Sequence, residues 1–165
     1  QWASLPALYA RVEVGNLHDD ALTFEPIHRV LFHVDGQDLW AAFRAFYPAA
    51  HTGAGTGHTV EVCGQGLDGA WTVPAPSAQL AVGTLQAFLD DYCKRRPEVE
   101  IDYIHGDDVA RKLGSQPGNL GFLLPPRGKD QLFRTVMTDG VLPRKTFSMG
   151  EAQDKRYYLE ARKIR

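Results

Sequence analysis

The sequence has little of what marks several common classes of protein. Only two of its 165 residues are cysteines, Cys63 and Cys93, and they lie outside any C-x-x-C spacing. This excludes a disulfide scaffold and predicts two reduced thiols in a reducing compartment. No run approaches the roughly 18 apolar residues that a membrane-spanning helix requires, and the first residues show no secretion signal. We therefore predict a cytoplasmic protein with no membrane partner.

The composition also lacks strong bias. Hydrophobic residues make up 44% of the chain and charged residues 23%, so disordered and collagen-like classes are excluded. A chain of 165 residues is long enough for one domain with a proper core, and we predict a single domain over residues 1–165. The chain begins with Gln1 rather than Met, so we expect it to be a fragment of a longer protein.

The small net charge of -2 conceals an uneven distribution along the chain. Residues 1–126 carry 8 basic and 15 acidic side chains, whereas residues 127–165 carry 10 basic and 5 acidic ones. A basic segment of this kind either forms a solvated surface or attracts a phosphate-bearing partner. Tyr157 and Tyr158 lie among these cations and could stack on bases, but no nucleic-acid recognition motif is present, so nucleic-acid binding is the weakest of the functional hypotheses.

The hydrophobic pattern predicts an α+β fold with a mixed, mainly antiparallel sheet and three to four helices packed on it. Residues 27–34 are mostly hydrophobic, with few polar residues between them, and are predicted to form a central strand. Asp107 is the predicted N-cap of a short helix, and Gly140 the predicted C-cap of another. The predicted strands are 8–14, 27–34, 58–62, 71–73, 99–104, 120–124, 146–149 and 157–164, and the predicted helices are 38–47, 82–93, 107–112 and 129–138.

The entry to the predicted central strand, Glu25-Pro26-Ile27-His28-Arg29, combines an acid, an imidazole and a guanidinium. Arginine offers bidentate donors that suit carboxylate or phosphate, and histidine transfers protons near neutral pH. We predict that His28 and Glu25 are catalytic and that Arg29 binds an anion. The alternative is an internal ion pair between Glu25 and Arg29.

The segment Leu142–Gly150 alternates cations and hydroxyls and ends at a glycine. These groups are the usual ingredients of an anion cradle, although the order differs from a Walker loop. A solvated loop is the alternative. His105 follows a predicted strand and precedes a predicted helix, where ligands tend to bind in α/β units, and a histidine that only caps the turn is the alternative. The predicted anion-binding residues of the chain are therefore Arg29, Arg144, Lys145, Thr146, Ser148 and His105, and no metal site is predicted.

The glycine-rich loop 51–58 contains two histidines and four glycines or alanines between them. It is not a dinucleotide fingerprint, because its glycines follow a predicted helix and precede a predicted hairpin. It also lacks the third ligand that a metal site would need. We predict a mobile loop.

Four strings of the sequence resemble the C-terminal half of a widespread bacterial domain-of-unknown-function family, number 1015. The resemblance runs from about Leu8 to Ile164. Its strings are Glu25-Pro26-Ile27-His28-Arg29-Val30, Asp102-Tyr103-Ile104-His105-Gly106, Leu142-Pro143-Arg144-Lys145-Thr146-Phe147-Ser148-Met149-Gly150 and Lys155-Arg156-Tyr157-Tyr158-Leu159-Glu160.

The resemblance implies a bacterial protein whose N-terminal half is missing from this chain. In longer relatives that half has a turn similar to a phosphate-binding motif of the ParB and sulfiredoxin superfamily. The nearest string here, Asp35-Gly36-Gln37-Asp38, lacks the histidine of that motif. The implied partners are the missing half and a small molecule or nucleotide, with Mg²⁺ arriving on the nucleotide.

The sequence is therefore compatible with two classes of function. In the first, the chain supplies one wall of a phosphate-binding site and the longer protein performs phosphoryl transfer, a reaction in which the enzyme mainly positions groups and neutralises charge. In the second, the chain is a non-catalytic interaction or scaffold domain whose His-Arg and Arg-Lys segments are internal ion pairs. The oligomeric state is not predicted by the sequence.

Overall fold

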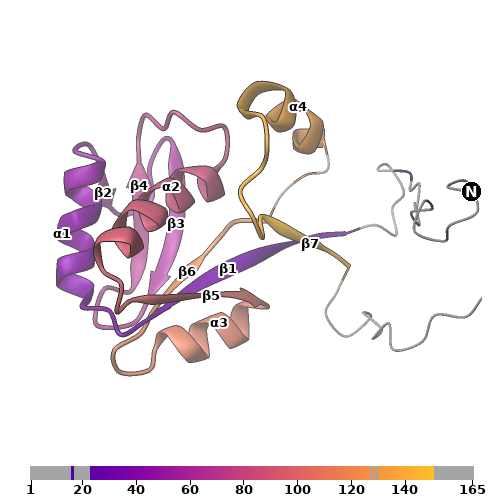
Figure 1. Cartoon of the computed structure of the whole chain (residues 1–165). Helices are drawn as coiled ribbons and strands as arrows, with labels where there is room; N and C mark the ends of the chain where they lie inside the picture. Colours follow the sequence, from indigo (N-terminus) through magenta and orange to yellow (C-terminus); the bar gives the residue numbers. More distant parts are fainter. Residues whose placement is uncertain (1–15, 17–22, 127, 129, 151–165) are drawn as a thin grey trace, which may run out of the picture.

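The computed structural model describes residues 16, 23–126, 128 and 130–150, which form an antiparallel sheet with helices on both faces (Figure 1). The helices are α1 (Gly36–Phe46), α2 (Ala81–Arg95), α3 (Asp107–Gly114) and α4 (Asp130–Asp139). The strands are β1 (Phe24–Phe32), β2 (His51–Thr52), β3 (His58–Cys63), β4 (Gly69–Val73), β5 (Glu100–His105), β6 (Leu120–Leu123) and β7 (Phe147–Met149). The predicted α+β class is confirmed.

The sheet has the strand order β2-β4-β3-β6-β1-β5, and β7 pairs with the first part of β1. The predicted central position of the strand after Pro26 is confirmed, because β1 is bonded to β6 on one edge and to β5 on the other. The change of partner along β1 is abrupt: Pro26 is opposite Phe147 of β7, and Ile27 is opposite His105 of β5. The sheet therefore forks at the peptide between Pro26 and Ile27.

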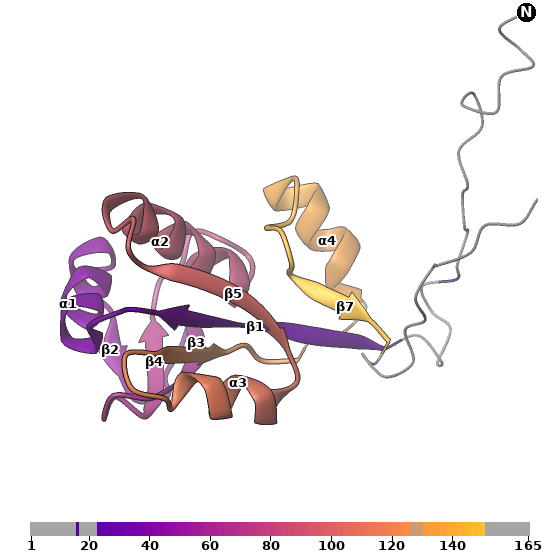
Figure 2. The ribbon, with the colours of Figure 1, turned by 60° about the horizontal axis from the view of Figure 1, so that its bottom comes forward.

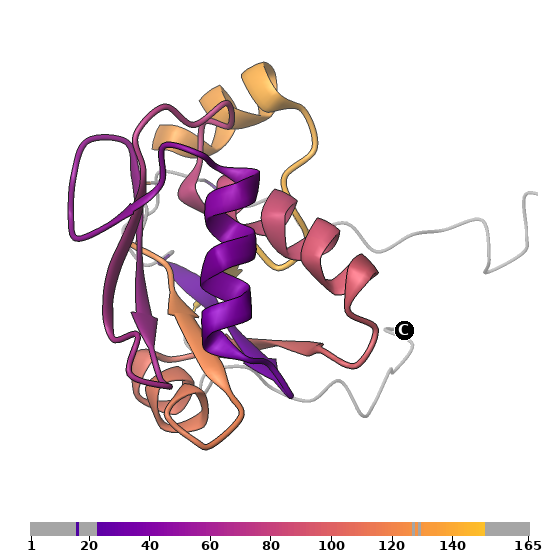
Figure 3. The same cartoon turned by 90° about the vertical axis from the view of Figure 1, so that its left-hand side faces the viewer.

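Alternation along β1 sends neighbouring side chains into two different cores. Helices α1 and α2 lie side by side over one face, and α3 lies on the other (Figures 2 and 3). Leu31 belongs to the larger core under α1 and α2, whereas Val30 belongs to a smaller core beside α3. Large members of the first core are Phe43, Trp71, Phe88, Tyr92 and Phe122, and the second contains Cys63, Ala110 and Leu123.

Two helix starts differ in detail from their predictions. Helix α1 begins at Gly36 rather than at Asp38, because Asp35 is the N-cap and its carboxylate accepts the N–H groups of Gln37 and Asp38. The N-cap of α3 is Gly106, at φ +96°, and not the predicted Asp107. The Asp107 side chain instead binds His28.

Two strand predictions are also corrected. Strand β1 begins at Phe24, so Glu25 and Pro26 lie within it because β7 gives them a pairing partner. The predicted mobile loop is wrong at His51 and Thr52, which pair with β4 as β2. The Gly53 N–H donates to the Ala70 carbonyl over 2.7 Å, and this bond continues the pairing.

The remaining predictions divide by whether they fall within the described residues. The hairpin β3–β4, helices α2 and α4, and strands β5, β6 and β7 are confirmed. Gly140 is confirmed as the residue that ends α4, with φ +79° and its N–H on the Val136 carbonyl. The predicted strands 8–14 and 157–164 lie outside the described residues. Within the described ranges, no helix is long and apolar enough to cross a membrane.

Helix α3 approaches β6 closely because glycines line the contact. An ideal Cβ on Gly114 would lie 2.6 Å from the Gly121 nitrogen and 2.7 Å from its Cα. Cys63 fills the space beside this pair, buried and without a disulfide partner. The contact fixes α3, and with it Asp107, against the sheet.

We predict that Gly114→Ala lowers the free energy of unfolding by about 1–3 kcal/mol, because the added methyl meets backbone that cannot move aside. Urea unfolding followed by tryptophan fluorescence measures the change. The matched control is Gly83→Ala in α2, where the added Cβ meets only the Ala78 side chain at 3.1 Å and helix propensity improves. Wild-type stability in Gly114→Ala would show that the contact is not close packed.

Candidate functional site

The two adjacent residues at the centre of the predicted site point to opposite faces of the sheet. His28 reaches α3, where its Nε2 lies 2.7 Å from Oδ1 of Asp107. Arg29 reaches α2, where its Nε donates to Oε1 of Gln86 over 3.3 Å. The structure therefore does not bring the His28 imidazole and the Arg29 guanidinium to one surface.

Both ring nitrogens of His28 have protein partners. The Leu124 N–H donates to Nδ1 over 3.1 Å, so Nδ1 must be unprotonated and the single proton resides on Nε2, facing Asp107. Burial lowers the pKa of His28 below its usual 6.5, and the Asp107 carboxylate only partly opposes this effect. His28 is thus a neutral, buried connection between β1, α3 and the residue that directly follows β6.

Arg29 has no exposed surface and, within the described part of the chain, no carboxylate at ion-pair distance. Its guanidinium is satisfied instead by neutral acceptors. Besides Gln86, one terminal nitrogen donates to the Ile27 carbonyl and the other to the Arg144 carbonyl, the latter over 3.2 Å. Burial lowers the pKa of Arg29 to about 10, which leaves the group charged at neutral pH.

Tyr103 connects the buried cation to an exposed one. The Arg29 guanidinium carbon lies 5.1 Å from the centre of the Tyr103 ring, and so does that of Arg144. The Arg144 Nε also donates to the Tyr103 hydroxyl over 3.0 Å. Sequence reasoning missed this role of Tyr103; its signal was the alternation that sets Tyr103 and His105 on one face of β5.

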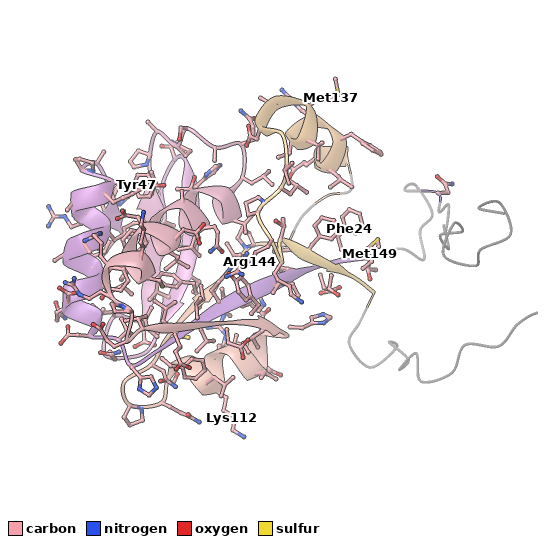
Figure 4. All side chains as sticks on the ribbon, viewed as in Figure 1. Phe24, Tyr47, Lys112, Met137, Arg144 and Met149 are labelled. Carbon is pink, nitrogen blue, oxygen red and sulfur yellow. The ribbon has the colours of Figure 1, made fainter. Side chains whose placement is uncertain are left out.

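The predicted cradle is a turn that directs its two cations outward. The Thr146 hydroxyl donates to the Pro143 carbonyl, so this buried hydroxyl closes the turn instead of facing a ligand. Lys145 has φ +55°, the left-handed conformation that such a tight turn requires. Arg144 and Lys145 are both exposed. In Figure 4 the Arg144 side chain lies next to β7, whereas Lys112 projects from α3 on the far side of the sheet.

An open pocket of about 440 Å³ lies where β5 and β7 diverge from β1. Its lining consists of Ile27, Tyr103, His105, Lys145, Phe147, Ser148 and Met149. Glu25 is opposite Ser148 in the β1–β7 pairing and is half-buried beside this pocket. Two narrow apolar crevices around Phe24 and Phe147 hold about 10 Å³ each, which is room for about one water molecule.

The predicted residues thus fall into three groups. Lys145, Ser148 and His105 line the pocket, with Arg144 and Glu25 next to it. Arg29 and Thr146 are buried beneath the turn that carries the cations. His28 lies on the other face of the sheet. No cluster of three His, Cys, Asp or Glu that could hold a metal ion occurs among the residues that the structure describes.

Comparison with known proteins identifies a shared fold. No family model matches the sequence, and no curated protein matches it. A solved free serine kinase variant in complex with AMP is similar to this chain with a TM-score of 0.61 and 10% identity, covering 84% of this chain and 58% of the kinase chain. The same variant in complex with ADP gives a TM-score of 0.61 and 12% identity, covering 91% and 64%. The chain therefore spans about three fifths of the solved kinase chains, and at these identities the similarity establishes the fold alone.

The pH dependence of stability tests the arrangement around His28. Because the pKa of His28 is below 6.5 in the folded chain, the unfolded chain binds more protons once the pH falls below about 6.5, and the folded state loses stability there. Asp38 and Glu61, whose pKa values are lowered from 3.8 and 4.5, act only at lower pH. We expect wild type to lose stability as the pH falls below about 6.5, and His28→Gln to show a flatter dependence there.

The His28→Gln variant should also be less stable at pH 7 by about 1–3 kcal/mol, because a buried bond network is broken. Chemical denaturation at several pH values measures both effects. His51→Gln, which removes an exposed imidazole from β2, is the control and should keep the wild-type dependence. A wild-type pH slope in His28→Gln would show that His28 is not the responsible group.

We predict that Arg29→Met lowers the free energy of unfolding by about 2–4 kcal/mol, since it leaves the Ile27 and Arg144 carbonyls without their donor. Arg29→Lys should recover little of the loss, because one ammonium cannot reproduce three bonds in different directions. Thermal and urea unfolding provide the measurement. Arg44→Met, at an exposed arginine in α1, should change stability by less than about 0.5 kcal/mol. An Arg29→Met variant as stable as wild type would mean that the guanidinium does not hold the turn.

Proposed function

We propose that this chain forms one wall of a phosphate-binding site for an adenine nucleotide, at the pocket between β5 and β7. The observation that carries the proposal is the charge of the pocket. Lys145 lines it, Arg144 lies at its edge and the buried Arg29 is below, and no carboxylate is among the lining residues that the structure describes. Such a surface attracts phosphate oxygens.

The arrangement of the two exposed cations supports binding rather than a solvated loop. Arg144 is held on the Tyr103 ring by its Nε bond and by cation–π attraction, so its guanidinium is positioned before a ligand arrives. The backbone of Lys145 is fixed by the left-handed turn that Thr146 closes, so the start of its side chain is fixed as well. Positioned cations lose less conformational entropy on binding than freely rotating ones.

We propose further that the longer protein transfers a phosphoryl group from the nucleotide to a hydroxyl group of a small molecule. The similarity in fold to a free serine kinase bound to AMP and ADP supports this class of reaction, and free serine is the acceptor that the similarity suggests. In the reaction the acceptor oxygen forms the new P–O bond, the nucleotide keeps the bridging oxygen, and the hydroxyl proton passes to a base.

The proposed roles follow from position. Lys145 and Arg144 bind the phosphate, Ser148 and His105 contact it from the pocket wall, and Arg29 positions the turn through the Arg144 carbonyl. Glu25, next to Ser148, is the proposed base, because it lies beside the pocket whereas His28 lies on the other face. The lining residues fit a phosphate and not a divalent cation, so Mg²⁺ would be held by the nucleotide and by groups outside this lining.

A non-catalytic interaction module is the second candidate function. It is supported by one specific observation: His28 and Arg29 are both buried and fully engaged with protein groups. The exposure of Arg144 and Lys145 at a pocket favours binding of an anion instead. Nucleotide titration separates the two candidates.

We predict that the chain binds ADP and that Lys145→Ala and Arg144→Ala each weaken binding by at least about tenfold, because a charge-assisted bond to phosphate is lost. Isothermal titration with ADP, and with adenosine as the ligand that lacks phosphate, measures the effect. Lys112→Ala is the matched control, as Lys112 lies on α3 on the far side of the sheet (Figure 4).

Several results would count against the proposal. ADP binding that is unchanged in both pocket variants, or reduced equally in Lys112→Ala, would remove the pocket from consideration. Adenosine binding as tightly as ADP would show that the phosphate is not recognised. Failure of both this chain and the longer polypeptide to bind ADP would favour the interaction module.

A further inference from the structure

Helix α4 has two apolar faces, only one of which the described part of the chain covers. On the inner face Thr135 is buried and Leu132 half-buried, and both line a narrow crevice with Phe24, Leu80 and Leu142. On the outer face Phe133, Val136 and Met137 follow the i, i+3, i+4 spacing of one helical stripe. Figure 4 shows Met137 on the side of α4 that points away from the sheet.

Four exposed hydrophobic side chains on α4 and directly after it are named the α4 patch: Phe133 at 61% exposure, Val136 at 42%, Met137 at 87% and Val141 at 95%. The other exposed large hydrophobic residues among those described are Phe46, Val109 and Met149, each on a different element. Scattered single residues of this kind need no explanation, but a cluster within nine positions of one segment marks an interaction site.

The place of the α4 patch in the chain, directly before the turn with Arg144 and Lys145, suggests which kind of partner would cover it. Val141 is followed directly by the turn that carries Arg144 and Lys145, and exposed Met149 lines the pocket itself. A body that covered the α4 patch as far as Val141 would therefore approach the turn that carries Arg144 and Lys145. The matched region amounts to only 58% and 64% of the solved chains that share its fold, so those chains contain further sequence that this chain does not match.

We infer that the α4 patch docks a second lobe of the same polypeptide, formed by sequence outside these 165 residues. Burial of three to four large apolar side chains supplies the driving force. Arg134 and Asp139, both exposed on α4, would lie at the polar edge of the contact. The inference does not rest on anion binding, because it would hold even if ADP did not bind.

Thiol labelling of Met137→Cys tests the inference. The variant is prepared in the 165-residue chain and in the polypeptide encoded by the complete gene, and the rate of reaction with a maleimide is measured against each parent. We expect labelling at least about tenfold slower in the longer polypeptide, because docking buries the thiol. Phe133→Cys should behave in the same way. Val109→Cys, on α3, is the control and should react at equal rates in both proteins.

Four results would overturn the inference. The first is equal labelling of Met137→Cys in both proteins, and the second is a complete gene that encodes no further sequence. The third is slow labelling already in the 165-residue chain at low concentration, because the chain would then cover its own patch. The fourth is labelling of that chain that slows as its concentration rises, because the partner would then be a second copy.

Discussion

The buried guanidinium of Arg29 is the interaction on which the rest of this architecture depends. One side chain joins β1 to α2 through Gln86 and to the turn before β7 through the Arg144 carbonyl. Neutral acceptors and an aromatic ring stabilise its positive charge without cancelling it. The surrounding protein therefore keeps a positive electrostatic potential that a carboxylate would have removed. The same group thus stabilises the fold and sets the electrostatic character of the pocket.

The fold could be predicted from the sequence to the extent that local periodicity determines it. The stripe of Leu39, Phe43 and neighbouring aromatics predicts α1, and the Leu67-Asp68-Gly69 turn predicts the β3–β4 hairpin. Local periodicity does not predict which distant segments of the chain pair as neighbouring strands. Glu25 and Pro26 read as a loop until β7, more than 120 residues later, provides them with a partner. His51 and Thr52 likewise become a strand only because β4 lies beside them.

The candidate site was less predictable, for a reason of the same kind. Adjacent residues of a strand point to opposite faces, so a His-Arg pair within a central strand divides between two environments. The His28 side chain therefore contacts α3, whereas the Arg29 side chain contacts α2. The cations of the turn were identifiable as residue types, but the surface they share with Tyr103 depends on the β1–β5 register that sets Arg29 opposite Tyr103. Thr146 was predicted to bind an anion, yet its hydroxyl donates to the Pro143 carbonyl.

The fork in the sheet also has a mechanical consequence. Three residue pairs join β7 to β1, whereas six join β5 to the same strand. The shorter ladder opens at lower cost than the longer one, so the turn with Arg144 and Lys145 is carried by the weaker branch of the fork. A ligand bound between β5 and β7 would connect the two strands through its phosphate and so restrict the motion of β7 relative to β5. When the ligand dissociates, the turn with Arg144 and Lys145 would become more mobile again.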